Sequence, residues 1–214
     1  MSDPKLHTGA VEPELASEFS GLALHWVELD AGSGRSPHEL RERLKDMSNR
    51  LNGPQAVQMR QQPIPWAYRV FFRQVGIDPD ERRTPIEQLV LDRLQHGGFR
   101  SRNLLDDAIS VATFETGVAI VAFDAALVEG GLGLRLSRPD ELMGDAGRPL
   151  ASGQIVIADR ERALAVLFAD LDPGRGVTPA TKRMLVSAVQ VEGVPDIAIE
   201  EALWTVAEIV TGAA

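Results

Sequence analysis

Hydrophobic residues along the chain follow two different spacings. In the first half they recur every three or four positions, which predicts amphipathic helices over residues 36–51, 66–76, 84–97 and 103–115. From Gly117 onward, short apolar or alternating runs predict strands, at 117–124, 132–137, 153–159, 162–170 and 184–194. An early apolar run, 21–30, predicts another buried strand, and residues 196–211 return to the helical spacing. Helices first, strands later and one closing helix predict an α+β fold rather than repeated βαβ units.

Residues with strong capping preferences bound the predicted helices. Ser36 and Thr84 each stand directly before a proline and three positions before a glutamate, so a capping box is expected at both helix starts. Asn-Gly-Pro at 52–54 should end the first helix, and Gly97-Gly98 should end the third. The aromatic side chains of the second helix are expected in the core: Trp66, Tyr68, Phe71 and Phe72.

Composition describes an ordinary globular chain. With 214 residues, 44% of them hydrophobic, we expect a single domain over residues 20–214 behind a flexible polar tail, residues 1–19. No apolar run reaches the roughly 18 residues of a membrane span, and the start lacks a secretory pattern, so a cytoplasmic location is expected. The absence of cysteine excludes disulfides and thiolate sites, and the four histidines lack zinc spacing. We therefore expect no metal and no cofactor.

The charge distribution is uneven. The net charge is −9, which disfavours nucleic acid unless positive charge is concentrated locally. Residues 69–102 carry seven arginines against five acids, a balance of +2 that leaves −11 elsewhere. This stretch is either a solvated helical face or a patch that faces phosphates.

The order of motifs between residues 60 and 212 resembles stand-alone relatives of the editing domain (B3/4) of the phenylalanyl-tRNA synthetase beta subunit. The matching positions are Arg69, Gly76-x-Asp78-Pro79, Arg83, Pro85, Leu89, Arg93, Asn103 and Asp106, followed by the runs at 122–124, 132–137, 153–159 and 178–183. The resemblance implies a three-layer β/β/α fold. It also implies contact with tRNA and hydrolysis in trans of the ester of a wrongly attached amino acid. Two positions depart from the family pattern: Ile109 replaces an asparagine, and Gln154 replaces a glutamate.

Hydrolysis of an aminoacyl ester needs a positioned water and hydrogen-bond donors rather than a nucleophilic triad. Asp107 and Glu115 are the candidate general bases. The candidate substrate-binding residues are Asn103, Asp106, Thr116, Asp124, Gln154 and Asp159. The candidate RNA-binding residues are Arg83, Arg93, Arg100 and Arg102.

Three functions stay open on this basis. The first is a tRNA-interacting aminoacyl-tRNA hydrolase, with tRNA or aminoacyl-tRNA as partner and neither DNA nor a membrane. The second is a non-catalytic RNA-binding module. The third is a small-molecule binding protein without an RNA role, which would show a compact pocket and dispersed arginines.

Overall fold

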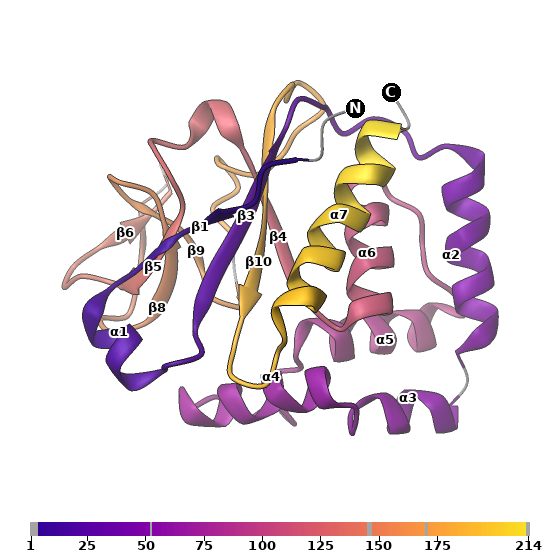
Figure 1. Cartoon of the computed structure of the whole chain (residues 1–214), viewed down its shortest axis with the longest axis horizontal. Helices are drawn as coiled ribbons and strands as arrows, with labels where there is room; N and C mark the ends of the chain where they lie inside the picture. The colour runs from indigo at the N-terminus through magenta and orange to yellow at the C-terminus, as the bar shows by residue number, and fades with distance from the viewer. Residues whose placement is uncertain (1–3, 52, 145–146, 170, 213–214) are drawn as a thin grey trace.

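Two four-stranded sheets and a layer of helices form the molecule (Figure 1). The computed structural model describes residues 4–51, 53–144, 147–169 and 171–212. Residues 1–3 of the expected tail, Asn52 at the expected helix stop and Asp170 at the end of the 162–170 run lie outside the described residues.

The central sheet has the order β1-β3-β10-β4, and all its strand pairs are antiparallel. Its strands are β1 (His7–Thr8), β3 (Ala23–Leu29), β10 (Met184–Gln190) and β4 (Ala119–Asp124). Six of the seven residues of β10 are buried. A strand buried this completely must be covered on both faces of its sheet, which makes β10 the centre of the fold.

The second sheet, at the left of Figure 1, has the order β2-β5-β8-β9. It contains β2 (Ala10–Val11), β5 (Gly133–Leu136), β8 (Ile155–Ala158) and β9 (Ala163–Val166). Strand β2 runs parallel to β5, and the other pairs are antiparallel. A short pair, β6 (Leu142–Met143) and β7 (Arg148–Pro149), packs beside this sheet, and a 3-10 turn, η1 (Ala125–Leu127), follows β4.

Two helices cover the other face of the central sheet: α6 (Leu104–Thr116) and α7 (Asp196–Gly212) (Figure 1). Ala108 and Ala112 of α6 and Ala202 of α7 are completely buried. Small side chains allow two helix backbones to approach closely. Helix α2 (His38–Arg50) lies outside α6, so the layers are sheet, sheet and helix, and the expected α+β, β/β/α fold is confirmed.

Three further helices lie across one end of these layers: α3 (Gly53–Met59), α4 (Pro63–Gln74) and α5 (Pro85–His96) (Figure 1). Tyr68 and Phe72 of α4 are completely buried, while Trp66 is 49% exposed. The core prediction for the aromatics of this helix is therefore confirmed for Tyr68, Phe71 and Phe72 and wrong for Trp66. No helix among the described residues is long and apolar enough to cross a bilayer.

The main strands and helices expected from the hydrophobic pattern are confirmed, but the chain termini and caps differ. Residues 7–18 lie in β1, β2 and a short helix α1 (Pro13–Glu18), and Leu15 is 1% exposed, which differs from the expected tail. The capping box at Thr84 is confirmed. The one at Ser36 is wrong, because the Ser36 hydroxyl donates to Asp107 instead, and Pro37 takes the cap position without a side-chain bond. Helix α3 was not expected.

Candidate functional site

A polar cleft of about 530 Å³ lies between α5 and the start of α6. Five of the candidate catalytic, substrate-binding and RNA-binding residues line it: Arg93, Arg100, Arg102, Asp106 and Asp107. The cleft is also lined by Leu89, Asp92, His96, Gly98, Phe99, Ser101, Ile109 and Ser110. Helix α5 ends at His96 and is followed by the C-cap residue Gly97, whose φ of 74° lies in the left-handed region; the chain then turns back across the cleft to α6.

Two arginines at this cleft are available to a ligand. Arg100 and Arg102 are exposed, and among the described residues neither side chain forms a hydrogen bond or an ion pair. Arg93 is half-buried and donates from Nη2 to the Ser48 carbonyl over 2.5 Å. The cleft thus combines one anchored and two unpaired guanidinium groups. Guanidinium groups suit phosphate or carboxylate oxygens.

Asp107 links the first turn of α6 to two neighbouring segments of the chain. Its carboxylate is 1% exposed and accepts three hydrogen bonds: from the Ser36 and Ser101 hydroxyls, both over 2.5 Å, and from the Arg102 backbone amide over 2.9 Å. These bonds tie α6 to the segment before α2 and to the chain that leaves α5. Because both carboxylate oxygens are used, the visible role of Asp107 is to fix the backbone of the cleft.

Asn103 and Asp106 form a second polar pair at the same helix end. Asn103 caps α6 by accepting from the Asp106 amide over 2.9 Å, and its Nδ2 donates to Asp106 Oδ2 over 2.9 Å. No described residue donates to Asp106 Oδ1. Asp106 is therefore a half-buried carboxylate in the cleft with one oxygen still open to a ligand or a water.

Glu115 and Thr116 lie at the other end of α6. Glu115 forms two hydrogen bonds with Arg43 Nη2 at 2.8 Å, and the Thr116 hydroxyl donates to the Ala112 carbonyl. Glu115 lies eight positions after Asp107 on the helix, about 12 Å along its axis. The structure thus does not bring the two candidate bases into one site.

Arg83 belongs to a separate ion cluster at the start of α5. The cluster consists of Arg60, Arg69, Asp80, Arg83 and Glu87. Buried Arg69 donates to Glu87 at 2.7 Å and to Asp80 at 2.9 Å. Hydrogen bonds from Arg69 and then Arg60 lower the pKa of Asp80 to about 2. Arg83 donates to Asp80 at 3.2 Å and so lies apart from the other three candidate RNA-binding arginines.

The remaining candidates end strands and turns. Asp124 accepts from the Thr181 hydroxyl over 2.5 Å and from the Ala126 amide over 3.0 Å. Asp159 is nearly buried and accepts three backbone amides, from Glu129, Glu161 and Arg162. These bonds explain both aspartates as turn-forming residues, and neither lines the α5–α6 cleft.

Gln154 lines a different pocket, of about 190 Å³, whose walls include Phe71, Arg82 and Phe168. Phe168 has a φ of 55°, an uncommon conformation for a residue with a side chain, and its ring lies 5.1–6.0 Å from those of Tyr68, Phe71 and Phe72. A second pocket of about 270 Å³ is lined by residues of both sheets, from β4, β8, β9 and β10, and also contains Arg83 and Phe168. Nothing in the sequence pattern distinguished Phe168 from an ordinary strand residue.

The described residues contain no group of three or more histidines or acids that could hold a metal ion. The α5–α6 cleft contains arginines, one carboxylate with an open oxygen and backbone groups. Hydrogen bonds fix the positions of the acidic side chains in this cleft, as a binding site requires.

Parts of the sequence are similar to those of known proteins. The family model described as B3/4 domain matches residues 67–199, more than half of the chain. The phenylalanine–tRNA ligase beta subunit of Vibrio cholerae is 33% identical over 98 residues, which cover 44% of this chain and 12% of that protein. The corresponding subunit of Colwellia psychrerythraea is 33% identical over 104 residues, 46% of this chain and 12% of the relative.

A third relative, the beta subunit of Psychrobacter arcticus, is 36% identical over 78 residues, which cover 35% of this chain and 10% of the relative. The aligned stretches thus span only about a tenth of the length of these relatives. The family model covers α4 from Ala67 onward, then α5, α6 and the strands from β4 to β10. On this evidence, the chain belongs to the B3/4 domain family.

Proposed function

We propose that this protein binds tRNA through the α5–α6 cleft and hydrolyses the ester of an aminoacyl-tRNA in trans. The observation that carries the proposal is the pair of exposed arginines, Arg100 and Arg102, which have no acidic partner among the described residues although the chain as a whole carries −9. Unpaired positive charge that an acidic protein keeps at a cleft indicates an anionic ligand. The similarity to phenylalanine–tRNA ligase beta subunits makes tRNA the expected polyanion.

In this proposal the groups in the cleft have different tasks. Arg100 and Arg102 take backbone phosphates, and Arg93 supports the chain between the helices through Ser48. Asp106 orients a water through its open Oδ1, while Asn103 holds the other oxygen. Asp107 keeps this arrangement in place through its three hydrogen bonds.

The reaction needs only water. The water oxygen attacks the ester carbonyl carbon while a carboxylate, Asp106 in this assignment, accepts a proton. The bond from that carbon to the ribose oxygen then breaks, and the proton passes from the carboxylate to the leaving ribose oxygen, which becomes a hydroxyl. The products are a free amino acid and an uncharged tRNA, so neither an oxidant nor a nucleotide is consumed.

Binding is tested first, with fluorescence-labelled tRNA and the purified chain at a series of salt concentrations. Replacing both Arg100 and Arg102 by glutamine should weaken binding at least tenfold and reduce the slope of log K against log salt by roughly 0.7–0.9 per lost contact. Arg138→Gln, an exposed arginine outside the cleft, is the matched control. Absent binding, or binding that is insensitive to salt and to both replacements, would leave only a small-molecule role.

Hydrolysis is tested with a panel of mischarged tRNAs. Asp106→Asn should reduce the deacylation rate at least tenfold without changing tRNA affinity more than about twofold. Salt-dependent tRNA binding with no deacylation by the unaltered chain would refute the hydrolase and select the non-catalytic RNA-binding module. That alternative is supported by the separation of Asp107 from Glu115 and by the saturation of the Asp107 oxygens.

A further inference from the structure

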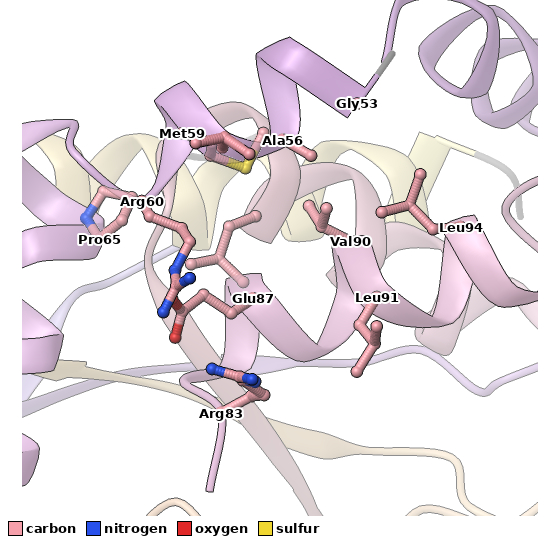
Figure 2. A pocket seen from close by; sticks show the side chains of 12 residues that line it. Gly53, Ala56, Met59, Arg60, Pro65, Arg83, Glu87, Val90, Leu91 and Leu94 are labelled. Carbon is pink, nitrogen blue, oxygen red and sulfur yellow. The ribbon is translucent and has the colours of Figure 1, made fainter. Parts of the chain in front are cut away.

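An apolar pocket of about 220 Å³ lies between α3 and α5, apart from the polar cleft, and it shares one lining residue, Arg83, with the pocket of about 270 Å³ that contains Phe168. Figure 2 shows Ala56 and Met59 of α3 on one side and Val90, Leu91 and Leu94 of α5 on the other. Pro65 and Ile86 complete the apolar wall, and no aromatic ring lines it. Val57 and Leu94 remain 62% and 43% exposed. The pocket is thus lined by aliphatic side chains and open to solvent at its rim.

One end of the pocket is charged. Arg60, Arg83 and Glu87 reach into it and point toward one another (Figure 2). They belong to the cluster of three arginines and two carboxylates, Asp80 and Glu87, which leaves a surplus of one positive charge. Glu87 is saturated, because Oε1 accepts from Arg60 and Arg69 while Oε2 accepts from the Thr84 amide and hydroxyl.

The surplus charge is located on the two arginines that line the pocket. Arg69 is 5% exposed and uses both terminal nitrogens inside the cluster. Arg60 and Arg83 are 38% and 32% exposed, and among the described residues no acceptor is bound to Arg60 Nη1 or to Arg83 Nε and Nη2. These donors can reach a ligand without breaking the cluster. Because a single charge remains uncompensated, a monoanion fits better than a phosphate dianion.

The wall formed by α3 lies outside the stretch that the family model matches. Residues 53–59 precede the stretch that the family model matches, and none of them is buried. Ala56 and Met59 nevertheless pack on a small cluster built from Leu51, Ile86 and Val90, which is separate from the main core. The helix therefore encloses a space beside α5 instead of filling it.

We propose that the α3–α5 pocket binds an aliphatic carboxylate, with its chain between Met59, Val90 and Leu94 and its carboxylate at Arg60 and Arg83. The aliphatic walls favour an alkyl chain, the open rim admits it, and the guanidinium end takes a single negative charge. This binding is independent of tRNA and of ester hydrolysis.

The test is a titration of the 214-residue chain with octanoate, followed by NMR of its labelled methionine, isoleucine, leucine and valine methyl groups. Saturable shifts are expected at Met59, Val90 and Leu94. Affinity should rise about fourfold for each methylene from hexanoate to octanoate. Octylamine, which has the same chain and the opposite charge, should bind at least tenfold more weakly. Equal binding of octanoate and octylamine, or shifts that do not saturate, would overturn the proposal.

Two variants locate the ligand. Arg83→Gln should weaken octanoate at least tenfold while leaving the neutral 1-octanol unaffected, a difference that simple loss of folding would not produce. Leu94→Asp should weaken both ligands. The matched controls are Arg138→Gln and Leu142→Asp, an exposed arginine and a 53% exposed leucine outside the pocket. If the controls weaken octanoate as much as the pocket variants do, the ligand lies elsewhere and the assignment is refuted.

Discussion

Replacing Asp107 separates a structural role from a catalytic one. The carboxylate is 1% exposed and accepts from Ser36, Ser101 and Arg102. Asp107→Ala leaves all three donors without their acceptor. The Ser36 side chain is 3% exposed and cannot reach bulk water, whereas Ser101 and Arg102 are exposed and can. Hydrogen bonds to a charged group contribute about 1.5–3 kcal/mol each, so with partial compensation by water we expect a loss of about 3–4 kcal/mol in the free energy of unfolding.

Asp107→Asn should cost less. The asparagine oxygen can still accept from the Arg102 amide, and its NH2 group can donate to the serine hydroxyls, which rotate to accept. We expect a loss of about 1–2 kcal/mol. The contacts alone therefore predict that the free energy of unfolding is lowest for Asp107→Ala, higher for Asp107→Asn and highest for the unaltered protein.

Urea denaturation followed by the fluorescence of the three tryptophans measures both values. With a slope of about 2 kcal/mol per molar urea, Asp107→Ala should lower the midpoint by about 1.5–2 M. Asp46→Ala, which removes an exposed aspartate from α2, should change it by less than about 0.25 M. If Asp107→Ala stays within 1 kcal/mol of the unaltered protein, the network does not fix α6, and any loss of activity in that variant would then be chemical.

Three further predictions concern the fold. Tyr68→Phe should destabilise the protein by about 1–2 kcal/mol in urea, because the completely buried hydroxyl bridges the backbones of β10 and β4; an unchanged midpoint would refute this bridge. Two hydrogen bonds from Arg135 lower the pKa of Glu141 to about 2, below its unfolded value, so the ion pair stabilises above about pH 4.5 and is lost as the pH falls toward 2. Glu141→Gln should therefore remove about 1–2 kcal/mol at pH 6 and little at pH 2, whereas a loss that is equal at both pH values would contradict the pairing. Gly117→Ala should cost about 1–2 kcal/mol in thermal unfolding, because φ is 77° and a Cβ would lie 3.2 Å from Ile64 and Pro65, while Gly34→Ala, with open space around it, should cost much less.

The sequence correctly predicted the helices whose signals come from residues close together in the chain. The helical spacing of Ile199, Leu203, Val206 and Val210 marked the buried face of α7, and the residues around Thr84 marked the start of α5. Serine at position 36 has the same local pattern, yet its hydroxyl bonds to a carboxylate 71 residues away. Capping rules describe what a side chain can do nearby and contain no information about a distant partner.

The candidate site was predictable only in part for the same reason. Arg93, Arg100, Arg102 and Asp106 meet in one cleft because they are close in sequence around a single turn between two helices. Arg83 was grouped with them by the same proximity, but it faces the ion cluster on the first turn of α5. The pocket around Phe168 combines residues from α4, β8 and β9, and no pattern along the chain indicates that these residues lie together.

Strand β3 also determines when the protein can fold during its synthesis. Its seven residues pair with β10, so that Leu29 lies opposite Met184 and Ala23 opposite Gln190. The ribosome must therefore complete residues 184–190 before β3 acquires this partner, and contacts this distant in sequence form slowly. Until then an apolar strand near the start of the chain is exposed to other chains, which is a common route to aggregation. Nascent chains that stop before residue 184 should depend on chaperones for solubility, whereas chains that include β10 can pair β3 within the same molecule.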